Sequence, residues 1–127
     1  MQRRRDERGA AVVEFALILP LLVLFVFGIV EFGRAYSARI ELTSAVREGA
    51  RAVALGANAA EAETVTKDAA PGLARDRLTV PTPTLCTVTP APPNARVEAH
   101  YPFTYTIPFF RDGTWTLQAT GVMRCGG

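Results

Sequence analysis

The side chain in this sequence that most needs a chemical explanation is Glu14, because its carboxylate stands inside the most apolar stretch of the chain. Residues 17–30 contain no charged side chain, and the apolar stretch reaches back to Ala10 if Glu14 is included. On insertion scales a central carboxylate costs about 2.5–3.5 kcal/mol, whereas each Leu, Ile or Phe returns only about 0.3–0.6 kcal/mol. A carboxylate can neutralise an amine. Glu14 is therefore a candidate functional residue.

Other side chains that could do chemistry lack partners at useful spacing. His100 is the only histidine, and its position on the polar face of a predicted strand favours a solvated residue over a catalytic base. Ser37 and Ser44 fall on a predicted helix with no histidine in local register. The sequence shows no phosphate-cradling glycine loop and no metal-ligand cluster. We therefore predict no catalytic residue, no metal site and no cofactor, and we do not expect an enzyme.

Cys86 and Cys125 are the only cysteines. In an oxidising compartment, a bond closing a loop of about 40 residues stabilises a small domain by roughly 4 kcal/mol in the chain-entropy model. A simple meander, with residues 85–88 paired to a strand starting at Arg96, would hold the cysteines about 9–10 Å apart, too far for a disulfide. We predict the bond, with Cys86 beside the last strand or on a crossing loop. The alternative is the simple meander with two free thiols.

The element that must position Glu14 is a membrane helix. Residues 10–30 can span a hydrocarbon core about 30 Å thick, which needs roughly 20 helical residues. The flank before them is basic: Arg3, Arg4, Arg5 and Arg8 stand against Asp6 and Glu7. The positive-inside rule keeps this end cytoplasmic and sends the chain after Val30 to the other side. A net charge of only +2 gives no case for nucleic acid as a partner.

Helical periodicity continues beyond the membrane. Apolar residues recur at helical spacing, and we expect this stripe to face a domain: Ile29, Phe32, Tyr36, Ile40, Val46, Ala50 and Val53. One helix is predicted from about Glu7 to Leu55, with Pro20 as a kink site and Gly56 in the stop signal. A second helix is predicted over residues 59–70, with Asn58 as N-cap and Glu61 in the capping-box position.

The C-terminal part alternates as strands do. One apolar face consists of Val97, Ala99, Tyr101, Phe103, Tyr105, Ile107 and Phe109, and after a turn signal at residues 111–113 a second consists of Trp115, Leu117, Ala119, Met123 and Cys125. Pro102 and Pro108 predict an irregular outer edge. Two strands with one apolar face each need a cover, and the long helix is the obvious one. The predicted fold class is α+β: a long N-terminal transmembrane helix that continues into a small domain with an antiparallel β-sheet.

Four motifs in order carry a family resemblance. Gly9 is followed by Ala10-Ala11-Val12-Val13-Glu14-Phe15, which resembles the prepilin peptidase site of tight-adherence (Flp) pilins. Leu19-Pro20-Leu21-Leu22, the phenylalanine- and glycine-rich residues 25–33, and Arg47-Glu48-Gly49-Ala50-Arg51 continue the pattern. Together they resemble the TadE-like family of minor pilins and pseudopilins strongly over about residues 8–56 and more loosely in the C-terminal third.

The resemblance implies a processed precursor. Residues 1–9 would be a leader, residues 10–33 the transmembrane half of the helix, residues 34–56 its amphipathic extracytoplasmic half, and residues 57–127 a small pilin-like domain. Cleavage would fall between Gly9 and Ala10, and Glu14 and Phe15 would serve peptidase recognition and assembly. The implied partners are the bacterial inner membrane, a prepilin peptidase, other pilin and pseudopilin subunits and the pilus assembly platform, and the implied role is in adhesion or secretion.

Two other interpretations remain open at this stage. An unprocessed single-pass protein could hold a small extracytoplasmic binding module at the membrane, with Glu14 reaching back to the headgroups. A cleavable secretory signal would also begin with basic residues and an apolar core, with Ala35 and Ser37 as small residues for cleavage. Glu31 and Arg34 between that core and those residues argue against the secretory signal.

Overall fold

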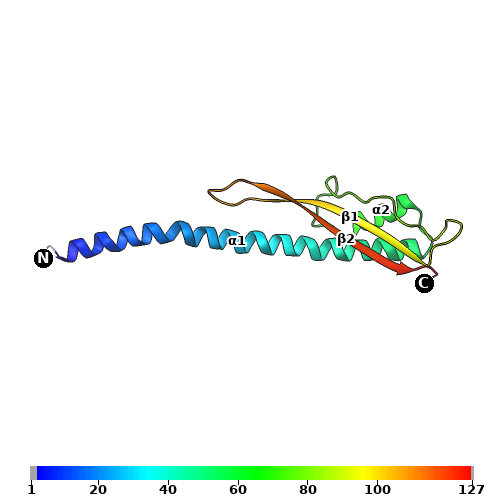
Figure 1. Cartoon of the computed structure of the whole chain (residues 1–127), viewed down its shortest axis with the longest axis horizontal. Coiled ribbons are helices and arrows are strands. Elements are labelled where there is room, and N and C mark those ends of the chain that lie inside the picture. The colour runs from blue at the N-terminus through cyan, green and yellow to red at the C-terminus, as the bar shows by residue number, and fades with distance from the viewer. Residues whose placement is uncertain (1–2, 127) are drawn as a thin grey trace.

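The computed structural model describes residues 3–126, and the side chains of residues 6–126. In chain order the elements are α1 (Arg3–Ala54), α2 (Ala59–Asp68), β1 (Asn94–Tyr105) and β2 (Gly113–Arg124). Figure 1 shows the sheet and α2 gathered on the C-terminal half of α1, while the N-terminal half of α1 projects alone. The predicted α+β class, a long apolar helix with a small sheet domain, is confirmed. The leader predicted at residues 1–9 lies partly outside the described residues, as do the side chains of Arg3, Arg4 and Arg5.

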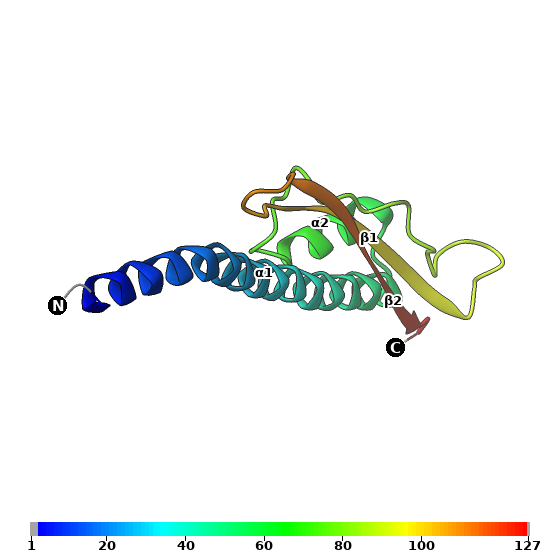
Figure 2. The same cartoon turned by 60° about the vertical axis from the view of Figure 1, so that its left-hand side comes forward.

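The long helix begins and ends close to the predicted residues. α1 continues without interruption through Pro20 and bends gently over its N-terminal half (Figure 2). At its C-terminus Gly56 takes a positive φ of 104°, its N–H donates to Val53 O, and the N–H of Ala57 donates to Ala52 O. This bond pattern is a Schellman cap, in which glycine supplies the left-handed residue that satisfies the last carbonyl groups. Gly56 therefore ends the helix for a local reason.

The face of α1 that meets the domain is lined by small and medium side chains. The buried residues on it are Ala38, Leu42, Ala45, Val46, Gly49, Ala50, Val53 and Ala54. The predicted stripe is thus right for Val46, Ala50 and Val53. It is wrong for Ile29, Phe32, Tyr36 and Ile40, whose side chains are 52–74% exposed. Small residues let a strand approach the helix closely, so the sheet lies on the alanine- and glycine-rich face and leaves the larger side chains outside.

The second helix starts where the sequence places it. Asn58 accepts a hydrogen bond from the N–H of Glu61 at 2.9 Å, and Glu61 accepts one from the N–H of Asn58 at 3.0 Å. This reciprocal capping box satisfies two N–H groups that the first turn would otherwise leave free. α2 packs on α1 through Ala62 and Thr66, both fully buried. The helix ends at Asp68, two residues before the predicted end.

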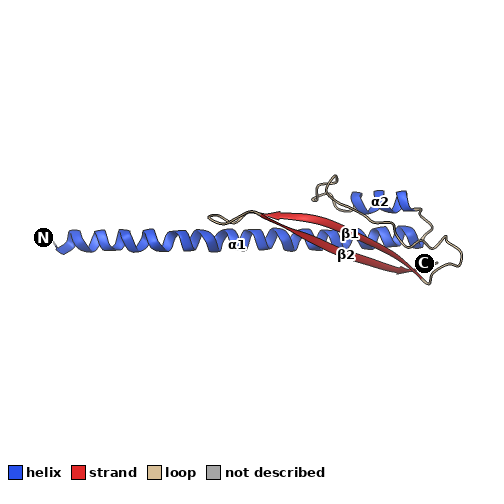
Figure 3. Cartoon of the chain, turned by 45° about the horizontal axis from the view of Figure 1, so that its top comes forward, coloured by secondary structure: helices blue, strands red, loops and turns tan. Residues whose placement is uncertain are grey.

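The sheet is one antiparallel pair, β1 with β2, in continuous register from Asn94 opposite Arg124 to Tyr105 opposite Gly113 (Figure 3). Alternation along β1 is as predicted up to Phe103, with odd-numbered residues buried. Within residues 3–126, the outer edge of β1 carries two isolated bridges, to Thr79 and Thr84. Pro102 lies two residues after His100, which forms the bridge to Thr79. The backbone nitrogen of Pro102 therefore faces this outer edge, and its missing N–H removes no hydrogen bond to β2. The irregular outer edge is confirmed at Pro102, whereas Pro108 lies in the turn beyond β1.

The disulfide joins Cys86 to Cys125, whose Cα atoms are 5.6 Å apart. Cys86 lies two residues after Thr84, which pairs with the outer edge of β1, and Cys125 directly follows Arg124, which pairs with Asn94 at the start of β1. The N–H of Cys125 donates to Pro93 O. The predicted bond is confirmed, with Cys86 in the loop between Thr84 and β1, and the alternative of two free thiols is wrong.

The hairpin between β1 and β2 differs from the prediction at its tip. β1 ends at Tyr105, so Ile107 and Phe109 belong to the connecting turn, which is closed by a bond from Phe110 N–H to Ile107 O. Phe109 is 81% exposed, and Trp115 on β2 is 63% exposed, so neither belongs to the core. The physical reason is length: the hairpin extends along α1 past the part that the rest of the domain covers (Figures 1 and 3).

Candidate functional site

The predicted processing site lies on the projecting half of α1. Gly9, Ala10, Glu14 and Phe15 are all exposed and helical, and apart from the local helix backbone no described atom lies within 4 Å of the place a Gly9 side chain would take. Gly9 and Glu14 are five residues apart, about 7.5 Å along the helix axis. The structure therefore presents the predicted residues together on one open helical segment. No contact from the domain covers them.

The environment of Glu14 is apolar. Its helical neighbours one turn away are Ala10, Ala11, Leu17 and Ile18, and within the described side chains Glu14 forms no hydrogen bond or ion pair. In the most apolar window of α1, no residue is buried by the rest of the protein, and α1 is long and apolar enough to cross a bilayer. In such a segment a carboxylate without a partner is costly. The fold does not supply that partner within the described residues.

The end of the apolar segment is marked by a second carboxylate that is well satisfied. Glu31 accepts a hydrogen bond from Arg34 at 2.7 Å and a longer one, 3.4 Å, from the backbone N–H of Thr106 in the hairpin turn. The Arg34 guanidinium also lies over the Phe103 ring, 5.5 Å from its centroid. The domain is therefore attached to α1 at the level where the apolar segment stops.

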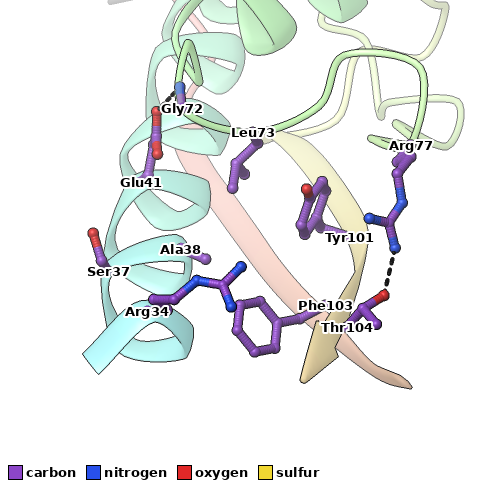
Figure 4. Close-up of a pocket in the computed structure, with 10 residues that line it drawn as sticks. All are labelled: Arg34, Ser37, Ala38, Glu41, Gly72, Leu73, Arg77, Tyr101, Phe103 and Thr104. Atoms are coloured by element: carbon purple, nitrogen blue, oxygen red, sulfur yellow. Dashed lines mark hydrogen bonds between the residues drawn. The ribbon is translucent and has the colours of Figure 1, made fainter. Parts of the chain in front are cut away.

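A cleft of about 280 Å³ opens between α1, the loop after α2 and β1 (Figure 4). Its charged groups are engaged within the protein. Glu41 accepts from the N–H of Gly72 at 2.6 Å, and Arg77 donates to Pro102 O and Thr104 Oγ1 while its guanidinium lies 5.6 Å from the Tyr101 ring centroid. These contacts lock the loop and β1 to α1.

The cleft offers no catalytic arrangement. Ser37 lines it, but no histidine does. His100 lies elsewhere on β1, partly exposed and 3.9 Å from Glu98. Among residues 3–126 no group of three His, Cys, Asp or Glu side chains is placed to hold a metal ion. The cleft is therefore explained by its internal contacts alone.

Fold and site together define a class: a long, apolar, membrane-compatible helix that carries a small α+β domain on its C-terminal half. Residues 9–51 match the family model described as TadE-like protein, which confirms the resemblance over about a third of the chain. The chain thus carries a TadE-like segment, which fits a protein of a tight-adherence pilus system. No curated protein and no solved structure gives a significant match.

The structure explains the end of the matched segment. A side chain at Gly49 would place its Cβ 2.1 Å from Thr66 Oγ1, so glycine is needed where α1 meets α2, and Ala50 beside it is buried. Arg47 and Arg51 are exposed. The small residues of Arg47-Glu48-Gly49-Ala50-Arg51 therefore dock the domain.

Two features escaped the sequence reasoning. The first is Gly121, where β2 meets the backbone of α1, and a glycine inside a strand pattern is a known sign of close backbone approach. The second is the hydrogen bond from the backbone N–H of Gly72 to the Glu41 carboxylate, which joins residues far apart in sequence and leaves no local sequence signal.

Proposed function

We propose that this chain is a minor pilin or pseudopilin precursor of a tight-adherence (Flp) pilus system. A prepilin peptidase removes residues 1–9, and the mature chain starts at Ala10. Residues 10–33 anchor the protein in the cytoplasmic membrane of a bacterium, with the N-terminus cytoplasmic and the domain, residues 57–127, outside. The protein then joins other pilin subunits at the assembly platform or in the surface pilus. Its role is structural, without a catalytic residue or cofactor.

The observation that carries this proposal is the unpartnered state of Glu14 on a bare helix whose sequence matches the TadE-like family. Cleavage after Gly9 creates an amine at Ala10, about 6 Å along the helix from Glu14 (four residues at 1.5 Å each). The two groups of one chain are offset along the axis. A neighbouring helix shifted by a similar distance brings its amine to this carboxylate, and such a pair is strong in a low dielectric.

The exposed apolar side chains outside the membrane segment support a packing role. Tyr36 and Ile40 are 61% and 52% exposed, and they continue the face of Ile29 and Phe32 out of the apolar segment. A lone soluble domain gains nothing from such a row, whereas a bundle of pilin helices buries it. We therefore assign this face to helix packing with other subunits.

Processing is tested by the N-terminal residue and intact mass of protein extracted from membranes of the native host. We expect the chain to begin at Ala10, and we expect Gly9→Val to leave the precursor uncut, because the peptidase must fit the residue before the bond. Gly33→Ala, another change at an open glycine of α1, is the matched control and should be processed normally. An intact N-terminus in cells that assemble functional pili would indicate the unprocessed membrane-anchored binding module instead.

Assembly is tested with Glu14→Gln and the control Glu31→Gln. Glu14→Gln keeps the shape of the side chain and removes its charge, so we expect appreciable cleavage but loss of copurification with other pilins. Glu31→Gln keeps an oxygen that can accept from Thr106 and Arg34, and should be cleaved and assembled normally. Cleaved Glu14→Gln protein that copurifies at the parent level would show that the carboxylate is not an assembly contact.

A further inference from the structure

The tip of the β1–β2 hairpin is the most exposed apolar part of the domain. Ile107, Pro108, Phe109 and Phe110 follow one another, and the two phenylalanines are 81% and 67% exposed. Trp115 stands close by on β2, opposite Phe103, and is 63% exposed. Three large aromatic side chains at one end of a small domain, all open to solvent, call for a partner.

The position of this tip relative to α1 identifies the partner. The backbone N–H of Thr106 donates to Glu31, the first charged residue after the apolar segment, and Ile107 to Phe110 lie beyond Thr106. Figures 1 and 3 show the turn extending past the sheet beside α1, toward its N-terminal half. If residues 10–33 cross a bilayer, the tip is therefore at the depth where the outer leaflet meets water.

The chemistry of the tip suits that depth. Aromatic side chains concentrate at membrane interfaces, where the apolar ring meets the acyl chains and polar groups stay hydrated. Arg111 and Asp112 follow the apolar residues and are exposed. Trp115 pairs with Phe103, which lies three residues before Thr106 in the chain. The Arg34 guanidinium is stacked over the ring of Phe103. This places the indole at the headgroup level just above Glu31.

The backbone adds an independent sign. Phe109 has a positive φ of 67°, a conformation that bulky residues rarely adopt. Strain of this kind persists where the surrounding structure or a function requires it. Here the strained residue directs a phenylalanine away from the fold rather than into the core.

We infer that the hairpin tip, residues 107–110, inserts into the interfacial region of the phospholipid leaflet on the domain's side of the membrane. The domain then contacts the bilayer at two points, the helix and the tip, which fixes its rotation and tilt relative to the membrane before assembly. This inference rests on the proposed membrane anchoring by α1 and goes beyond it, because a helix alone leaves the domain free to rotate.

The test uses the full-length protein in phospholipid vesicles, at a lipid excess that keeps copies apart, with Trp115→Phe as background so that one tryptophan reports. Phe109→Trp reports on the tip. Val88→Trp, in the loop after Cys86 at the other end of the hairpin, is the matched exposed control, and Phe25→Trp reports on the apolar segment. Quenching is measured with lipids brominated near the headgroup end or near the end of the acyl chains.

We expect Phe109→Trp to be quenched by the shallow bromine at least about twofold more than Val88→Trp, since interfacial aromatic residues lie at the headgroup level. Equal quenching of these two positions, with Phe25→Trp strongly quenched, overturns the tip inference and leaves membrane anchoring intact. No quenching of Phe25→Trp overturns the anchoring and the inference with it. Shielding of Phe109→Trp from aqueous iodide without any lipid quenching would assign the tip to a protein contact and also overturn the inference.

Discussion

β2 approaches the backbone of α1 closely at Gly121, and this approach supports a quantitative prediction for Gly121→Ala. The added Cβ would stand 2.2 Å from Val46 O, 2.5 Å from Val46 C and 2.9 Å from Arg47 N. Carbon and oxygen normally approach to about 3.3–3.6 Å, so the strand and the helix must separate by about 1 Å. All three atoms belong to the backbone, and no side-chain rotation can relieve the overlap.

The size of the effect follows from the contacts that this separation weakens. A gap of about 0.5–1 Å forfeits a quarter to a half of the dispersion energy at the affected contacts. Overpacking of this kind costs about 1–3 kcal/mol. Alanine returns about 0.4–1 kcal/mol by restricting the unfolded chain. We therefore expect a net loss of about 1.3 kcal/mol, the difference between the middles of these two ranges. This loss lowers the Tm of a domain this small by roughly 5–10 °C.

Thermal unfolding in detergent, followed by near-UV circular dichroism with the disulfide intact, measures this shift. Gly33→Ala is the matched control, because it also replaces a glycine by alanine and, apart from the local helix backbone, no described atom lies within 4 Å of its new Cβ. A Gly121→Ala protein whose Tm stays within about 2 °C of the parent, well below the shift worked out above, would show that β2 does not rest on the backbone of α1.

Two further changes test the domain. Cys86→Ala should lower the free energy of unfolding by about 4 kcal/mol in the chain-entropy model, since the bond spans 39 residues. Thiol labelling of membrane-extracted parent protein should detect thiols only after reduction. Equal labelling with and without reductant would contradict the bond. Asn58→Ala removes the acceptor for Glu61 N–H and should cost about 1 kcal/mol, whereas an unchanged denaturant midpoint would show that the capping box is dispensable.

The features predicted well from sequence are those with local causes. Asn58 and Glu61 are three residues apart and cap one turn, so their chemistry is readable without a fold. Gly56 ends α1 because it alone adopts the left-handed conformation without cost. Alternation along β1 is equally local, and it holds up to Phe103; beyond that residue, burial depends on how far the rest of the domain extends.

The failures have non-local causes. α1 carries apolar residues on more than one face. Periodicity alone could not distinguish the face around Leu42, which packs against the domain, from the face of Ile29 and Ile40, which stays exposed. The docking face is chosen by close packing against Gly121 and Thr66, which lie far away in sequence. The position of Cys86 near Cys125 likewise depends on the bridges of Thr79 and Thr84 to the outer edge of β1.

Glu31 and Glu14, the two carboxylates in and at the end of the apolar segment of α1, differ in whether the fold supplies them with a partner. Glu31 has partners from its own helix and from the hairpin, so this carboxylate is satisfied within one chain. Glu14 has no such partner among the described residues, and a charge in an apolar segment is retained when something outside the fold compensates it. Changes near Gly121 or Cys86 should therefore alter domain stability and leave processing intact. Changes at Gly9 or Glu14 should alter processing or assembly and leave the unfolding of the domain unchanged.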